Sequence, residues 1–219
     1  MQRIPEPDLM DDPAQAQAYA GADFSEPHQA LVAHFRERFP DFHNGSVLDL
    51  GCGNADVSVR FCHAYPGVRL TGIDGAQAML NLGLDAVEQA GMGARISLQK
   101  VYLPDSSLSR LRFDAVISNS LLHHLDDPVT LWQTVKAVAQ ADTPILIMDL
   151  LRPSNMDEAR KLVEAYADDA PELLRRDFFN SLLAAYRPEE IRTQLQQAGL
   201  PLLQIEIVSD RHMLIWGRA

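Results

Sequence analysis

The sequence predicts an α/β fold in which a mostly parallel sheet is covered by helices on both faces. From residue 45 onward, strand-like and helix-like segments alternate, as they do in right-handed β-α-β units. Several strand-like runs are almost wholly apolar, which is typical of strands buried on both faces. The last two strand-like runs are joined by only a short turn around Asp210, so that pair must be antiparallel.

Hydrophobic periodicity gives the order of the elements. The segment 76–90 is expected to be a helix with Leu80, Leu84 and Val87 on one face. A helix over 127–140 should have Asp127 as its N-cap, and Gly199 should end a helix over 188–199. The other expected elements are a helix at 55–65 and strands at 47–50, 68–74, 95–100, 113–119, 144–151, 202–209 and 211–219.

Two segments lie outside this alternation. Residues 1–40 include one expected helix, at 27–39. Residues 152–187 include two more: the first opens with the capping pattern Ser154-x-x-Asp157, and the second is the aromatic-rich "ELLRRDFFNSLLAAY". Insertions after the strand ends of an α/β sheet are where a lid belongs, so a helical lid is expected at 152–187.

Composition limits the range of functions. The formal net charge of −11 disfavours an extended nucleic-acid surface. The first residues lack an apolar leader, and no window approaches the roughly 18 apolar residues of a membrane span. Cys52 and Cys62 make neither a disulfide framework nor a zinc site, and are expected to be reduced thiols. We therefore expect a cytoplasmic protein without a membrane partner.

The stretch "VLDLGCGNA" (47–55) predicts a ligand-binding turn between the first strand and its helix. Gly51 and Gly53 would let a ligand approach the backbone closely. The dinucleotide pattern G-x-G-x-x-G fails because its last position is Asp56, which would repel a pyrophosphate, and there is no P-loop. Asp74, at the end of the second strand, suits the two hydroxyls of a ribose. A ligand with an adenosine end and no phosphate, such as S-adenosylmethionine, fits this pattern.

These motifs together resemble those of class I S-adenosylmethionine-dependent methyltransferases of the small-molecule type, over roughly residues 45–219. The resemblance is carried by "VLDLGCGNA", "GIDGAQAML", "FDAVISNSLLHHLDDP", "ILIMDLLRP" and "YRPEEIRTQLQQAGL". It implies a Rossmann-like seven-stranded sheet in the order 3-2-1-4-5-7-6 with strand 7 antiparallel. It also implies one domain with an N-terminal helical cap (1–44), a cofactor-binding core (45–151), a helical lid (152–187) and a C-terminal helix and antiparallel hairpin (188–219).

The resemblance also assigns site residues. Asp74 should hold the ribose, Met79 should pack on the adenine, and Asn119 and Ser120 should border the methyl group. In two positions the sequence departs from the family pattern: Ala55 replaces the third glycine, and Gln99 replaces the usual acid after strand three. The full set expected to bind S-adenosylmethionine, and its product S-adenosylhomocysteine, is Tyr19, Asp49, Gly51, Cys52, Gly53, Asn54, Asp74, Gly75, Met79, Gln99, Lys100, Val101, Asn119 and Ser120.

The acceptor side is less defined by the sequence. His123 and His124 are the candidate catalytic bases, needed only if the acceptor loses a proton; the alternative is that one packs locally and the other faces solvent. A metal on the two histidines with Asp126 or Asp127 is disfavoured, because all four lie on one short segment, and no metal is expected. Substrate contacts are expected from Tyr166, Phe178, Phe179, Asn180 and Tyr186.

The expected function is methylation of a small molecule on N, O or S. A macromolecular acceptor, a cofactor-binding protein that does not methylate, and a nicotinamide oxidoreductase remain alternatives. The net charge and the absence of an N-P-P-Y-type motif at 119–122 weigh against nucleobase amines. The apolar positions of "DFFNSLLAAY" could serve a homodimer as well as a lid.

Overall fold

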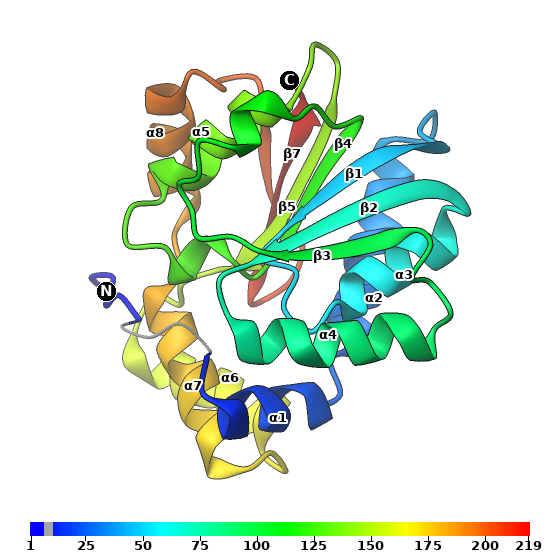
Figure 1. Ribbon diagram of the computed structural model, residues 1–219. Coiled ribbons are helices and arrows are strands. Elements are labelled where there is room, and N and C mark those ends of the chain that lie inside the picture. The colour runs from blue at the N-terminus through cyan, green and yellow to red at the C-terminus, as the bar shows by residue number, and fades with distance from the viewer. Residues whose placement is uncertain (7–10) are drawn as a thin grey trace.

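A seven-stranded mixed sheet forms the centre of the protein (Figure 1). The computed structural model describes residues 1–6 and 11–219. The strand order 3-2-1-4-5-7-6 and the antiparallel pairing of strand 7 with both of its neighbours confirm the predicted topology. The strands are β1 (Asn44–Leu50), β2 (Gly67–Asp74), β3 (Ile96–Lys100), β4 (Ala115–Asn119), β5 (Pro144–Leu150), β6 (Gln204–Ile207) and β7 (His212–Arg218).

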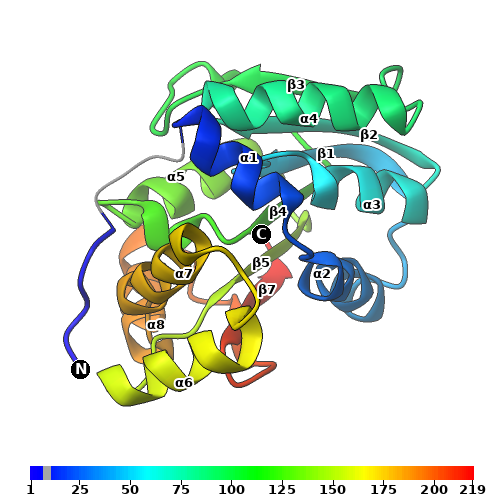
Figure 2. The same cartoon turned by 90° about the horizontal axis from the view of Figure 1, so that it is seen from below.

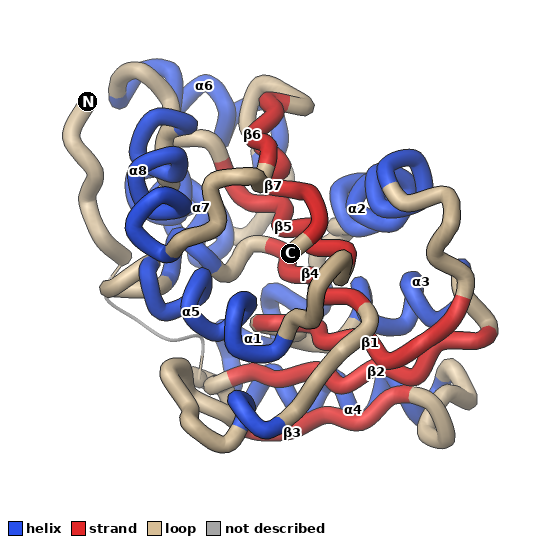
Figure 3. Tube along the Cα trace, turned by 90° about the horizontal axis from the view of Figure 1, so that it is seen from above, coloured by secondary structure: helices blue, strands red, loops and turns tan. Residues whose placement is uncertain are grey.

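Helices cover both faces of the sheet because successive strand residues point to opposite sides. Val47 packs in one buried cluster with α2 (Ser25–Arg38), α3 (Asp56–Ala64) and α4 (Gln77–Gln89). Its neighbour Leu48 packs in a second cluster with α5 (Val129–Val138) and α8 (Pro188–Ala198). Figure 3 shows the sheet between these two layers.

Three further helices lie together at one end of the sheet, as Figures 1 and 2 show. They are α1 (Pro13–Gly21), α6 (Met156–Ala167) and α7 (Glu172–Ala184). The last two form the predicted helical insertion and enclose a small core of their own with Leu150. The helix α1 was not predicted, because "PAQAQAYAG" has no apolar stripe and buries only Ala16. The N-terminal segment therefore has two parts: α2 joins the helix layer of the sheet, and α1 lies over its end.

Some local predictions need correction. Leu84 is 53% exposed, because the buried face of α4 runs through Met79, Leu80, Gly83 and Val87 instead. The N-cap of α5 is Pro128, although the Asp127 carboxylate still accepts a hydrogen bond from the Val129 N–H at 3.0 Å.

Two further boundaries differ from the prediction. The N-cap of α6 is Asn155, whose side chain accepts from two backbone N–H groups, so the predicted start at Ser154 is one residue early. β6 spans four residues only, and Leu202 before it is 83% exposed. Gly199 ends α8 in the left-handed conformation, as predicted. Among the described helices, none is long and apolar enough to cross a membrane.

Candidate functional site

The turn after β1 lies where the strand order reverses, since β1 pairs with β2 on one side and β4 on the other. Such a switch point is where open α/β sheets bind ligands. Gly51 and Gly53 have φ values of +71° and +52°. A Cβ atom on Gly51 would lie 2.8 Å from the Leu121 Cβ, so glycine is required there. Ala55, the non-glycine third position, also takes a positive φ of 62°, which is strained for a residue with a Cβ.

Asp74 connects this turn to the start of α4. Its Oδ2 accepts a hydrogen bond from the Gly53 N–H at 2.9 Å, and its Oδ1 accepts one from the Ala76 N–H at 2.8 Å. A carboxylate oxygen has two lone pairs, so each oxygen can still accept from a ligand hydroxyl. Asp74 thus braces the turn and still has lone pairs that could accept hydrogen bonds from a ligand.

Asp49 lies beneath the turn. Its side chain is 1% exposed, and its Oδ2 accepts a 2.6 Å hydrogen bond from the Ser58 hydroxyl of α3. Burial raises the pKa of Asp49 to about 7, against the opposing effect of the Ser58 hydrogen bond. The expectation that Asp49 surrounds a ligand directly is therefore modified: the side chain faces α3 behind the loop.

Cys52 packs against β2. A Cβ atom on Gly72 would lie 2.9 Å from the Cys52 Sγ, so the absence of a side chain at Gly72 makes room for the thiol. Burial raises the pKa of this thiol well above its ordinary value, which makes it a poor nucleophile. Any contact of Cys52 with a ligand in the turn would therefore come from its backbone.

The helix α1 covers the turn. Met79 is buried against Ala16 of α1, and its Cε lies 3.1 Å from the position of a Cβ on Gly53. Tyr19 packs on the same cluster, and burial together with nearby carboxylates raises its pKa to about 12. The Gln15 side-chain amide donates to the Asp177 carboxylate of α7 at 2.8 Å. The helix therefore links α4 to α7 above the turn.

The end of β3 is adjacent to Asp74. The Val101 N–H donates to the Asp74 carbonyl at 2.9 Å, and Lys100 is the register partner of Asp74. Gln99 is exposed and pairs with Ile73. Lys100 and Val101 thus lie next to Asp74, whereas Gln99 is one position further back along β3.

The end of β4 presents an unsatisfied amide. The Oδ1 atom of Asn119 is buried and has no hydrogen-bond partner among residues 1–6 and 11–219. A buried amide oxygen normally accepts a hydrogen bond, so the Asn119 Oδ1 is free to accept one from an N–H or O–H group of a ligand. The next residue, Ser120, has a φ of +56°, and its N–H donates to the Met148 carbonyl of β5 at 2.9 Å.

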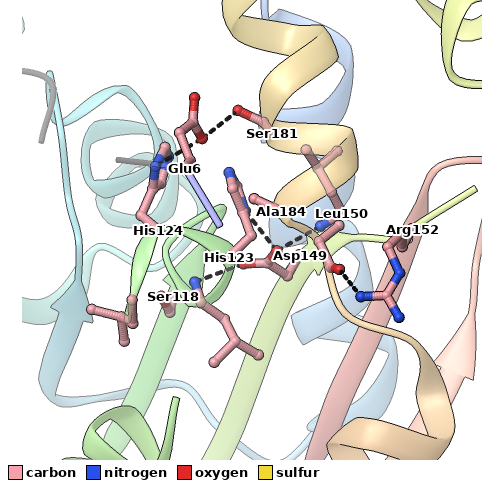
Figure 4. Close-up of polar contacts among 12 residues, drawn as sticks. Glu6, Ser118, His123, His124, Asp149, Leu150, Arg152, Ser181 and Ala184 are labelled. Atoms are coloured by element: carbon pink, nitrogen blue, oxygen red, sulfur yellow. Dashed lines mark hydrogen bonds and ion pairs between the residues drawn. The ribbon is translucent and has the colours of Figure 1, made fainter. Parts of the chain in front are cut away.

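Both histidines lie in a short 3-10 helix (Leu122–His124) after β4 (Figure 4). The Nδ1 atom of His123 is 2.7 Å from the Asp149 Oδ1, and both side chains are almost fully buried. The His124 side chain is 28% exposed, and its Nδ1 is 3.2 Å from the Glu6 Oε2. This arrangement matches the alternative in which one histidine packs against the protein and the other faces solvent: His123 is buried and hydrogen-bonded, and His124 is partly exposed.

The five predicted substrate residues are spread over the helical insertion and its end. Phe178, Phe179 and Asn180 are half-buried on α7. Tyr166 is 48% exposed and donates its hydroxyl hydrogen to Asp210 in the β6–β7 turn. Tyr186 is buried, with the Arg3 guanidinium 4.3 Å above its ring centroid.

Sequence reasoning missed the partners of the histidines. Asp149 carries a signal, because it is an acid within the otherwise apolar run "PILIMDLL". Glu6 and Ser181, which are hydrogen-bonded to each other at 3.0 Å, carry none, since contacts between residues so distant in the chain follow no local pattern.

The sheet order, the glycine turn and the acid at the end of β2 define a class I S-adenosylmethionine-dependent methyltransferase fold. Residues 47–142 match the family described as "Methyltransferase domain". This match covers 96 of the 219 residues, and together with the sheet order it supports a class I methyltransferase.

Curated relatives are distant. A demethylmenaquinone methyltransferase of Bacteroides fragilis is 23% identical over 51% of this chain and 46% of its own length. A 27-O-demethylrifamycin SV methyltransferase of Amycolatopsis mediterranei is 25% identical over 79% of this chain and 60% of its own. A tRNA (guanine-N(7)-)-methyltransferase of Anaeromyxobacter dehalogenans is 26% identical over 81% and 92%. The chain thus spans only about half the length of several of the curated relatives that it matches.

Solved structures share the fold. The plantazolicin methyltransferase BpumL in complex with SAH has a TM-score of 0.70 at 14% identity, covering 94% of this chain and 91% of its own. An O-methyltransferase family protein from Burkholderia thailandensis has a TM-score of 0.71 at 16% identity, covering 95% and 60%. The [4+2]-cyclase SpnF also aligns, with a TM-score of 0.59 at 18% identity over 86% and 61%.

Proposed function

We propose that this protein binds S-adenosylmethionine at the carboxyl ends of β1, β2 and β4 and transfers its methyl group to a small-molecule acceptor. The observation that carries the proposal is the contact between the glycine turn and Asp74 at the switch point of the sheet. It leaves an open-backbone turn beside a carboxylate that can still accept hydrogen bonds from a ribose. The family of the core and the fold of its neighbours support the same ligand.

The hydrogen-bond acceptors at the site suit this cofactor. Asp74 would accept from the ribose hydroxyls, and the unpaired Oδ1 of Asn119 would accept from an N–H or O–H of the ligand. No basic side chain is hydrogen-bonded into the turn among the described residues, which suits a ligand without phosphate. Met79, Ala16 and Tyr19 pack in one cluster beside the turn and would give an adenine ring an apolar contact surface.

The chemistry asked of the chain is mainly alignment. The sulfonium of S-adenosylmethionine supplies an already activated methyl group. The protein must hold the acceptor within about 3–3.5 Å of that carbon and exclude water. The helices α1 and α7, which are joined by the hydrogen bond between Gln15 and Asp177, would shield the methyl group from solvent. Where the acceptor loses a proton, the pair His123 and His124 lies beside the end of β4 to assist.

A small acceptor is favoured over a macromolecule. The relative from Anaeromyxobacter dehalogenans acts on tRNA, but the net charge of −11 here would oppose a polyanion. The [4+2]-cyclase among the fold neighbours keeps open a role without methylation. Transfer of a labelled methyl group to metabolite extract, compared with transfer to total tRNA, separates the three alternatives.

Calorimetric titration with S-adenosylmethionine and S-adenosylhomocysteine tests the binding step. Asp74→Ala should weaken both by about 1.5–3 kcal/mol, roughly 10- to 100-fold, because a charge-assisted hydrogen bond is lost. Asp85→Ala, an exposed position on α4, is the control and should bind like the wild type. His123→Ala and His124→Ala should leave cofactor affinity nearly unchanged. Unaltered affinity in a folded Asp74→Ala protein would remove the basis of the proposal.

A further inference from the structure

Three side chains that ligate metals converge beside the end of β4. Glu6 comes from the N-terminal segment, and His123 and His124 come from the 3-10 helix. One donor atom from each lies within 4.8 Å of the other two. Figure 4 shows the two rings and the carboxylate gathered around one region. Around a tetrahedral ion with bond lengths of about 2.0–2.2 Å, neighbouring ligand atoms lie roughly 3.4 Å apart. Movements of these side-chain atoms by about an ångström would therefore bring all three within bonding distance of one ion.

The surroundings of His123 are those of a metal ligand. Its Nδ1 faces the Asp149 Oδ1 at 2.7 Å, which leaves Nε2 free to coordinate. Asp149 is itself held by N–H donors from Leu122 and Leu150, each at 2.8 Å. A carboxylate that fixes the tautomer of a histidine from behind is the usual outer partner of a ligating imidazole. In the described part of the chain, no residue is hydrogen-bonded to the Nε2 of His123.

The N-terminal segment is docked so as to deliver Glu6. The Arg3 guanidinium donates to the Ala184 carbonyl at 2.6 Å and to the His123 carbonyl at 2.9 Å. The Ile4 N–H donates to the Leu183 carbonyl at 3.0 Å. These bonds join the segment to α7 and to the 3-10 helix, so that the Glu6 side chain is 10% exposed beside His124.

Glu6 is the anionic ligand of the set. Its Oε2 atom lies 3.2 Å from the His124 Nδ1. The Ser181 hydroxyl donates to Glu6 at 3.0 Å and fixes the carboxylate. The alternative to a metal site is a simple ion pair between Glu6 and His124. That ion pair would explain their contact, but it would give no role to the Nε2 of His123 or to the hydrogen bond between His123 and Asp149.

We propose that Glu6, His123 and His124 bind one divalent transition-metal ion, with Asp149 as the outer partner of His123. Two imidazoles and a carboxylate suit Zn²⁺, Co²⁺, Mn²⁺ or Fe²⁺, whereas Mg²⁺ and Ca²⁺ prefer oxygen ligands throughout. Three protein ligands leave coordination positions open. On the proposed function, an acceptor oxygen, nitrogen or sulfur would occupy one of these positions, and the ion would lower its pKa so that its proton passes to water. His123 and His124 would then act as ligands instead of as bases.

The test is a Co²⁺ titration of the full chain after treatment with a chelator, followed by visible absorption, and a calorimetric titration with Zn²⁺. We expect one equivalent bound per chain. Glu6→Gln and His124→Ala should each weaken binding at least tenfold. His63→Ala and Glu26→Gln, which change exposed residues on α3 and α2, are the controls and should not affect it. Asp149→Asn should weaken binding about 10- to 100-fold.

The outcomes are distinct. The absence of stoichiometric binding by folded protein, or weak binding that Glu6→Gln leaves unchanged, overturns the metal site. The Asp74→Ala variant should bind Co²⁺ normally. Cofactor binding without metal binding would therefore retain the proposed function and reject the metal site. Metal binding without cofactor binding would retain the metal site and reject the proposed function.

Discussion

The buried carboxyl group of Asp49 makes the stability of the protein depend on pH. Burial raises its pKa from 3.8 to about 7 in the folded chain. Between these values the folded chain keeps a proton that the unfolded chain has released. The free energy of unfolding of the wild type should therefore fall by about 1.4 kcal/mol per pH unit as the pH rises through this window. Above the window it should stay level. Asp49→Asn removes the titrating group while keeping an oxygen that can accept from Ser58.

The measurement is urea unfolding of wild type and Asp49→Asn between about pH 5 and pH 8. The free energy of unfolding of the variant minus that of the wild type should grow by about 3 kcal/mol over this range. Other titrating groups cancel in the difference. Asp85→Asn, at an exposed position on α4, controls for the loss of one surface carboxylate. A difference that stays constant, or that shrinks as the pH rises, would refute the reasoning.

Other predictions concern stability. Burial and a neighbouring arginine lower the pKa of His212 from 6.5 to about 4, so the wild type should lose stability as the pH falls through that window; thermal unfolding of His212→Gln should lack this loss. Leu80→Ala should cost about 2–5 kcal/mol in urea unfolding, whereas Leu84→Ala should cost under about 1 kcal/mol because Leu84 faces solvent. Equal costs would place both in the core. Trp132→Phe should cost about 1–3 kcal/mol, since Trp132 donates to Gln194 in the interior; an unchanged unfolding midpoint would contradict this.

Sequence reasoning succeeded where the determinants are local. The apolar alternation fixed the sheet, and the glycine turn with Asp74 follows from residues that are neighbours in the chain or at strand ends. Ala55 stands where the family pattern has a third glycine, and it keeps the left-handed conformation that a glycine would adopt there.

The misses have physical causes. The helix α1 has too little amphipathic character to stand out, and its place comes from contacts with α4 and α7. The prediction placed Leu84 on the buried face of α4 because it is apolar. In the structure Gly83 lies on that face instead, and Leu84 is exposed. Glu6 reaches His124 through tertiary contacts that no periodicity encodes.

The two sides of the site differ in how the chain builds them. The side proposed to bind the cofactor comes from the stretch between the turn after β1 and the first turn of α4, from the strand ends beside it, and from α1, which packs on Met79. The acceptor side comes from the N-terminal segment, the 3-10 helix, β5 and α7, which meet only in the folded protein. On this assignment, exchange of residues 1–6 together with α6 and α7 for those of another methyltransferase should redirect the acceptor, while α1 and the rest of the cofactor side remain as they are.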